Sequence, residues 1–243
     1  MDITRNDRVR MERAHVHAWP ALQTANIDGW LWRASGGGSQ RANSVSTVDF
    51  TGNNLDHAID AVERRYCTCG EPARFQTFDE TNPPDLANRL RQRGYRQSQP
   101  TITMFRATEP IAPPAGVEHQ HQVFPAWAHV YLGAITENRR AVNARILHQV
   151  PAPRAFFAYR GIATALCVVS FRCAVIECVA THADARRQGA ARTVLAALLA
   201  WAGEQDTDLI GLQVVADNTP AIRLYETLGF VAGATNRFWV IPT

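Results

Sequence analysis

The sequence predicts a mixed α/β protein made of two similar units in tandem, each a twisted mixed sheet flanked by helices. Three observations support this. Strand-like apolar runs alternate with amphipathic helical segments along all 243 residues. A stretch with three prolines, "EPIAPPAGVEH", divides the chain near its middle. The two halves also end with the same order of elements. We therefore expect a first domain over 1–108, a linker over 109–118 and a second domain over 119–243.

The shared ending is seen in "RFQTFDETNPPDLANRLRQRGYRQ" and "GLQVVADNTPAIRLYETLGFVAG". Each stretch predicts a strand, an Asn-x-Pro turn, a short helix and a Gly-aromatic pair. Asn82 and Asn218 stand at nearly the same spacing as Gly94 and Gly229. An Asn-Pro turn or a glycine after a helix is common by itself. The shared order predicts an internal duplication.

The first half is predicted to begin with a helix over 8–19 and two strands over 27–35 and 41–50, joined by a turn at three glycines, 36–38. A helix over 55–67 follows, because its apolar residues recur on one face. The remaining expected elements are a strand over 74–78, a helix over 86–93 and a strand over 95–105.

After the linker, helical segments are predicted to about residue 149 and three strands over 155–159, 163–171 and 175–181. The expected elements that close the chain are a helix over 187–204, a strand over 210–215, a helix over 220–228 and a strand to 241.

The amino-acid composition narrows the classes of protein to which the chain can belong. Hydrophobic residues make up 46% of the chain and the net charge is only +3, so the balance of charge does not indicate a nucleic-acid-binding protein. The polar N-terminus is unlike a signal peptide, and no apolar run is long enough for a membrane span. Five cysteines, an odd number, show no pattern of a disulfide scaffold, which predicts a cytoplasmic protein. Cys67 and Cys69 have no second pair at ligand spacing, so we expect scattered buried thiols and no metal site.

The stretch "THADARRQGAARTVLAALLAWA" places two arginines and a glycine where a strand gives way to a long apolar helix. A helix N-terminus presents free N–H groups and a positive dipole end, which favours phosphate. Gly189 allows close approach to the backbone, and Arg186, Arg187 and Arg192 add positive charge. No Gly-Lys-Ser/Thr or G-x-G-x-x-G motif is present. We therefore expect a pyrophosphate that belongs neither to a P-loop nor to a dinucleotide fold.

The pattern Arg186-x-x-Gly189-x-Ala191 resembles the coenzyme A signature of the GNAT superfamily of N-acetyltransferases, and "LQVVADNTPAIRLYETLGF" resembles the next motif of that superfamily. Together the two motifs cover roughly residues 163–230. The first half has no counterpart of the arginine-glycine turn and resembles a divergent copy, as in tandem GNAT proteins. The resemblance implies transfer of an acetyl group from acetyl-CoA to a primary amine in a ternary complex. It implies one coenzyme site, in the second half.

The resemblance also implies site residues. The backbone of Val179, Ala180 and Thr181 is expected to bind the pantetheine arm. In the second motif, Asn218 is expected to contact the pantetheine, with Ala221 beside it. The residues expected to cradle the pyrophosphate are Arg186, Arg187, Gln188, Gly189, Ala190, Ala191 and Arg192.

Two catalytic roles follow. Tyr225 matches the tyrosine that protonates the departing thiolate in many superfamily members, although a core aromatic is the alternative. Gln213 stands where some relatives have a glutamate, and an amide cannot act as a base. Glu177, alone in an apolar strand, is the expected replacement, because burial should raise its pKa. A carboxylate that is exposed at a sheet edge or held in a salt bridge is the alternative, and His182 is a second candidate base.

The acceptor is left open among a small amine, an amino acid, an antibiotic and a peptide N-terminus. Trp30, Trp32 and Arg33, with residues 36–45, form an aromatic and polar strip that fits either an acceptor pocket or a packed core. Two other functions also fit the sequence. The protein could bind acyl-CoA without turnover as a sensor, or its first half could recruit a protein substrate.

Overall fold

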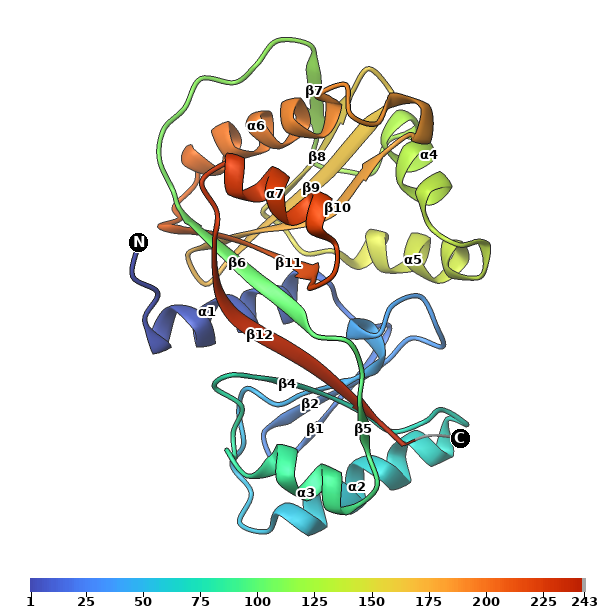
Figure 1. Cartoon of the computed structure of the whole chain (residues 1–243). Helices are drawn as coiled ribbons and strands as arrows, with labels where there is room; N and C mark the ends of the chain where they lie inside the picture. Colours follow the sequence, from blue (N-terminus) through green and yellow to red (C-terminus); the bar gives the residue numbers. More distant parts are fainter. Residues whose placement is uncertain (242–243) are drawn as a thin grey trace.

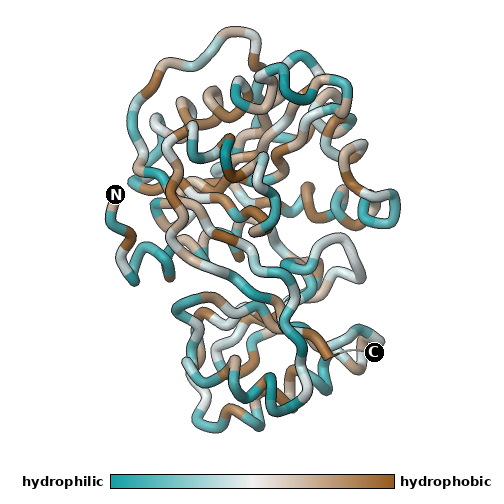
Figure 2. The backbone as a smooth tube through the Cα atoms, viewed as in Figure 1, coloured by the Kyte–Doolittle hydropathy of each residue, from teal (hydrophilic) through white to brown (hydrophobic). Residues whose placement is uncertain are grey.

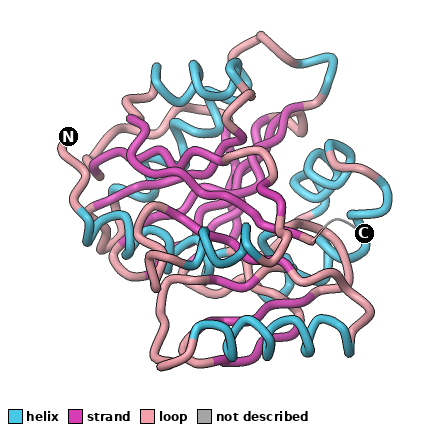
Figure 3. The backbone as a smooth tube through the Cα atoms, turned by 60° about the horizontal axis from the view of Figure 1, so that its bottom comes forward, coloured by secondary structure: helices cyan, strands magenta, loops and turns pink. Residues whose placement is uncertain are grey.

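The computed structural model describes residues 1–241, and its strands form one mixed sheet with helices packed against it (Figures 1 and 3). Along the main path the strand order is β1-β2-β3-β4-β12-β6-β11-β10-β9-β8-β7, with β5 paired to β12. The predicted mixed α/β class is confirmed. None of the helices within residues 1–241 is both long and apolar enough to span a bilayer.

The first half has the predicted helices but differs in its strands. The predicted strand over 27–35 is wrong at its start, because Asp28 and Gly29, with φ of 50° and 89°, turn the chain between β2 and an additional strand, β1. The predicted strand over 41–50 is mostly a 3-10 turn and a two-residue strand, because Asn43 and Ser39 hold the chain in a compact loop through side-chain bonds to its backbone. The predicted strand over 95–105 is interrupted and forms two strands. The elements are α1 (Arg5–Ala18), β1 (Gln23–Ile27), β2 (Trp30–Ala34), a 3-10 turn (Arg41–Asn43), β3 (Val45–Ser46), α2 (Leu55–Thr68), β4 (Arg74–Phe78), α3 (Leu86–Gln92), β5 (Arg96–Gln97) and β6 (Thr101–Ala107).

The second half matches the prediction closely, with one short strand, β7, beginning inside the predicted linker. The predicted helix over 187–204 begins later, at Ala190, because Arg187 and Gly189 have positive φ angles of 62° and 81°. The elements are β7 (Val117–Gln120), α4 (Pro125–Ala134), α5 (Glu137–Gln149), β8 (Arg154–Tyr159), β9 (Ala163–Ser170), β10 (Cys173–Thr181), a 3-10 turn (Ala183–Ala185), α6 (Ala190–Gly203), β11 (Leu209–Val215), α7 (Thr219–Thr227) and β12 (Val231–Val240).

The two halves exchange their last strands. Strand β6, from the first half, pairs with β11, and strand β12, from the second half, pairs with β4. The two exchanged strands then pair with each other, antiparallel, in the middle of the sheet. In Figure 1 they connect the upper and lower parts of the molecule. The order β4-β12-β6-β11 is symmetric about its centre, which supports the predicted duplication.

A buried carboxylate lies at this centre. Glu12, on α1, is 4% exposed. It accepts hydrogen bonds from Gln76 (2.9 Å), Gln213 (3.1 Å) and Asn236 (2.7 Å). Gln76 and Gln213 occupy the same place in the two repeated stretches. A buried carboxylate needs such donors, so this cluster joins α1 to both halves of the sheet.

The apolar interior forms three clusters. One lies under α1, α4 and α5, a second lies under α6 and α7, and a third fills the first half around α2 and α3. Hydrophobic residues line α6 and the strands behind it in Figure 2. Trp30 and Trp32 are fully buried in the third cluster. All five cysteines are free, but the expectation that they are buried thiols is wrong for Cys67 and Cys69, which are exposed near the end of α2.

Candidate active site

Strands β10 and β11 separate in the middle of the second half. They pair in parallel from Cys173 to Ile176 and no further, although β10 continues to Thr181. On the other side of β10 the register with β9 shifts between Glu177 and Ala180, where Cys178 has a positive φ of 54°. Such a bulge bends the strand and increases its twist. On the β11 side, the backbone of Val179, Ala180 and Thr181 therefore faces a gap in the sheet, while Ala180 and Thr181 stay paired with β9 on the other side.

The turn that leads into α6 stands at the end of this gap. Gly189 is the N-cap of α6, and a Cβ built there would meet no atom within 4 Å. Arg186, Arg187 and Gln188 are exposed, and within residues 1–241 no carboxylate pairs with either arginine. Ala190 and Ala191 begin the helix, so their N–H groups have no intrahelical acceptor. The turn therefore presents unpaired positive charge and free donors, as an anion site requires.

A cavity of about 580 Å³ lies between this turn and α4. Thr181, His182 and Arg186 line one wall, and His129 and Arg140 line the other. The His182 side chain is about half exposed, with Asp184 3.6 Å away. Three of the sequence-predicted residues thus share one basic cavity, to which α4 adds His129 and α5 adds Arg140.

Glu177 is buried at the point where the strands separate, and its surroundings correct the sequence-based expectation. Arg41 donates from both terminal nitrogens to its two carboxylate oxygens, each at 2.5 Å, and His15 Nδ1 lies 3.5 Å from one of them. Burial opposes ionisation, but Arg41 outweighs it and lowers the pKa of Glu177 to about 2. The expectation that burial raises this pKa is wrong. Glu177 is ionised at neutral pH and is a weak base.

Tyr225, on α7, is 7% exposed and packs edge-on against Phe230 with ring centroids 6.1 Å apart. Burial, with a smaller contribution from the charge of Glu177, raises the pKa of Tyr225 to about 12. No hydrogen bond joins its hydroxyl to any group in residues 1–241. The phenol is therefore protonated at neutral pH and has a proton to donate. Its packing also fits the core role that the sequence left open.

Asn218 has a structural task. It is the N-cap of α7, and its side-chain oxygen accepts a hydrogen bond from the N–H of Ala221 (3.3 Å). Its amide nitrogen makes no hydrogen bond within the described chain. Gln213 donates to Glu12 and is thereby held in the buried cluster at the centre of the sheet.

Arg41 and His15 are the two site residues that sequence reasoning missed. Both come from the first half and reach Glu177 in the second. Arg41 belongs to the strip 36–45 that was singled out for its polar composition, but no local pattern could show that it pairs with a residue far along the chain. Trp30 and Trp32, from the same strip, lie in the core.

The chain resembles known proteins along almost its whole length. The family model described as "Probable histone acetyltransferase Rv0428c C-terminal" matches residues 6–239. The uncharacterized N-acetyltransferase YobR of Bacillus subtilis is 25% identical over 237 residues, which cover 93% of this chain and 95% of that protein.

Solved structures show the same fold. A GCN5-related N-acetyltransferase from Kribbella flavida superposes with a TM-score of 0.69 at 17% identity, covering 97% of this chain and 95% of that one. A tandem GNAT protein from the clavulanic acid biosynthesis pathway superposes with a TM-score of 0.58 at 13% identity, covering 76% of this chain and 68% of that one.

Proposed function

From the premise that the chain belongs to the GNAT acetyltransferase family described as "Probable histone acetyltransferase Rv0428c C-terminal", we propose that it moves an acetyl group from acetyl-CoA to a primary amine. The acceptor is a small molecule, an amino acid or a peptide N-terminus. The observation that carries the proposal is the gap between β10 and β11, which ends at the arginine-glycine turn.

In this proposal the pantetheine arm of the coenzyme lies along Val179, Ala180 and Thr181. The strand edge there has the free backbone groups that an added extended chain needs. The pyrophosphate lies on the turn from Arg186 to Arg192, where free N–H groups and unpaired guanidinium groups meet. The first half has no such turn, so one coenzyme binds per chain.

The amine must be neutral to attack the thioester carbonyl, and it forms a tetrahedral oxyanion. A backbone N–H of β10 near Val179 is placed to donate to that oxyanion, because this part of the strand has no partner on β11. When the C–S bond breaks, the thiolate takes a proton. Tyr225 is the proposed donor, since its hydroxyl is protonated and makes no other hydrogen bond in the described chain.

For Glu177 we propose a positioning role in place of the base role. Its charge holds Arg41, and so holds the loop of the first half against β10 at the point where the strands separate. Proton removal from the incoming ammonium then falls to solvent or to His182, which is exposed in the cavity beside the turn.

The test is release of free coenzyme A thiol from acetyl-CoA with a panel of amines, amino acids and short peptides. Acceptor-dependent thiol release that is lost in Gly189→Glu supports the proposal. Tight binding of acetyl-CoA with no acceptor-dependent release across the panel would instead support the acyl-CoA sensor.

A further inference from the structure

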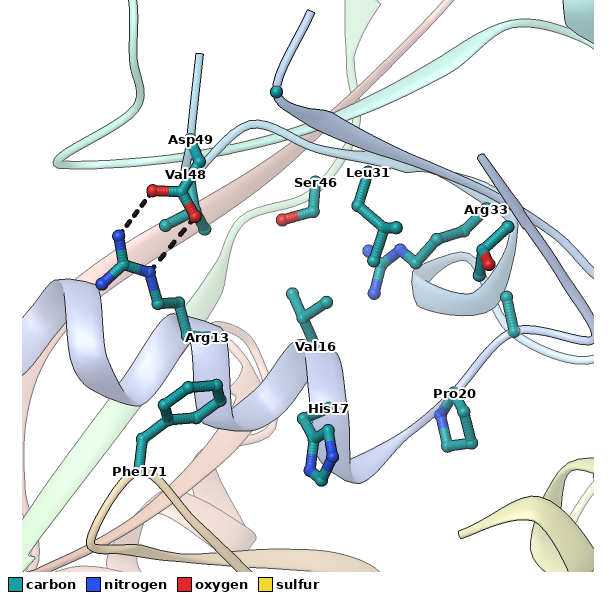
Figure 4. A pocket seen from close by; sticks show the side chains of 13 residues that line it. Arg13, Val16, His17, Pro20, Leu31, Arg33, Ser46, Val48, Asp49 and Phe171 are labelled. Carbon is teal, nitrogen blue, oxygen red and sulfur yellow. Dashed lines mark hydrogen bonds and ion pairs between the residues drawn. The ribbon is translucent and has the colours of Figure 1, made fainter. Parts of the chain in front are cut away.

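The first half contains a cavity of about 550 Å³ to which the proposed mechanism assigns no role. It lies between α1 and the opposing face of β2 and β3, and the turn between β9 and β10 forms part of its rim (Figure 4). None of the residues expected to bind coenzyme lines it. Its walls are largely apolar, formed by Val16, Pro20, Leu31, Val48 and Phe171.

A buried cation faces this apolar space. Arg33, on β2, is 1% exposed and lines the cavity, and Figure 4 shows its guanidinium extending into it beside Leu31. Its Nε donates to the carbonyl of Ser44 (2.9 Å), and one terminal nitrogen, Nη2, donates to Gln76 (2.8 Å) and to the hydroxyl of Ser44 (3.3 Å). The other terminal nitrogen, Nη1, donates to no group in residues 1–241.

No carboxylate of the described chain forms an ion pair with Arg33. The nearest in the hydrogen-bond network, Glu12, is reached only through the amide of Gln76. Burial lowers the pKa of Arg33 to about 10, which leaves it charged at neutral pH. The charge of Glu12 offsets this burial only indirectly, and a bound anion would give the guanidinium a direct ion pair.

We propose that this cavity binds a small monocarboxylate with an apolar body. The carboxylate accepts hydrogen bonds from Nη1 of Arg33 and from the hydroxyl of Ser46, which lines the cavity and has no partner in the described residues. The apolar body lies against Val16, Leu31 and Val48.

The charges around the cavity favour a single negative charge on the ligand. Arg33 is the only buried cation that lines it within the described residues. Arg13, at the rim, is already paired with Asp49 through two hydrogen bonds, drawn as dashed lines in Figure 4. Asp49 would repel a second negative charge.

The rim also favours an apolar tail. Phe171 is 52% exposed at the rim of the cavity. Its φ is positive (51°), which is uncommon for a bulky residue. Its ring lies 6.1 Å from that of His17, edge-on. A cavity of this volume falls in the range that holds small organic ligands.

The test is isothermal titration calorimetry of the full chain with octanoate, in the presence of saturating coenzyme A. We expect one equivalent of octanoate to bind, and octan-1-ol, which has the same tail without the charge, to bind at least about tenfold more weakly. Val16→Trp, which fills the cavity, should abolish octanoate binding. Val9→Trp, a matched change elsewhere on α1, should not. Arg33→Met should lose octanoate binding, with its melting temperature recorded beside it.

Any of four results would overturn the proposal. The first is no saturable binding of octanoate up to about millimolar concentration. The second is equal affinity for octanoate and octan-1-ol, and the third is unchanged octanoate affinity in Val16→Trp. Displacement of octanoate by coenzyme A would also overturn it, since the acid would then lie in the groove between β10 and β11.

Discussion

Glu177 shows how one contact reverses the chemistry of a residue. A lone carboxylate in an apolar strand is expected to have a raised pKa, but the bidentate contact with Arg41 lowers it to about 2. Because the folded-state pKa is below the ordinary value of 4.5, this pair stabilises the protein fully above about pH 4.5. The contribution is lost as the pH falls from about 4.5 toward 2.

Glu177→Gln should therefore destabilise the protein by about 3–5 kcal/mol at pH 7, because it leaves Arg41 partly buried without its carboxylate. The double variant Glu177→Gln/Arg41→Met should recover part of that loss. Urea unfolding measures both, with Glu118→Gln on the exposed strand β7 as the control. A rate profile in which Glu177→Gln removes a limb near pH 6–7 would contradict the positioning role and restore Glu177 as a base.

Tyr225→Phe should lower turnover at least tenfold while coenzyme affinity and melting temperature hold, because it removes a hydroxyl that makes no hydrogen bond in the described chain. Tyr66→Phe is the matched contrast. The Tyr66 hydroxyl donates to the carbonyl of Arg33 at 2.7 Å, so its loss should cost about 1 kcal/mol of stability with no kinetic effect. If Tyr225→Phe lowers the melting temperature and leaves turnover intact, Tyr225 is a core residue.

Among the secondary-structure elements, helix α7 begins at a residue, Asn218, whose side chain has two roles. The oxygen of Asn218 caps the helix, and its amide nitrogen is free to donate to a pantetheine carbonyl. The substitution Asn218→Asp keeps the capping oxygen and removes the donor.

For Asn218→Asp we expect an unchanged melting temperature and a coenzyme affinity about tenfold weaker than that of the wild type. Asn218→Ala, which removes both groups, should also cost about 1 kcal/mol of stability. Equal affinity in wild type and Asn218→Asp would limit Asn218 to capping.

The elements of the second half could be predicted because their signals are local. The run from Ala190 to Gly203 is apolar at helical spacing, and the strands before it are continuous apolar runs. The elements of the first half were harder to predict from the sequence. Arg41 to Asn43 form a 3-10 turn held by side-chain hydrogen bonds, which no alternation pattern shows. Contacts between distant residues, such as Arg41 with Glu177, could not be predicted at all.

The exchange of β6 and β12 predicts that the whole molecule unfolds as one cooperative unit. Each half needs a strand from the other to complete its sheet, and Glu12 joins them through one buried cluster. Deleting the first 110 residues would remove β4, β5 and β6, which would leave β12 without its partner strands and β11 paired with β10 alone. An interaction module that can be separated from the rest of the chain is therefore hard to reconcile with this sheet.

Leu90→Ala, in the buried core of the first half, should lower the stability of both halves equally, by about 2–5 kcal/mol. Fluorotryptophan NMR follows the unfolding of Trp32 in the first half and Trp127 in the second separately. In Leu90→Ala we expect both probes to report the same denaturant midpoint, lowered relative to the wild type. The matched variant Leu198→Ala on α6 should also lower the midpoint of both probes by the same amount. A shift of Trp32 alone would show that the halves unfold independently.

The measurement that tests the central claim most directly is calorimetric titration of acetyl-CoA into the wild type, Gly189→Glu and Gly94→Glu. Gly94 is the matched control, because its φ of 84° is close to that of Gly189 and a Cβ there also meets no atom within 4 Å. One coenzyme per chain is predicted for the wild type and for Gly94→Glu, and none for Gly189→Glu, whose new negative charge would lie on the pyrophosphate site. Two equivalents per chain, or unchanged affinity in Gly189→Glu, would contradict a single coenzyme site at the turn before α6.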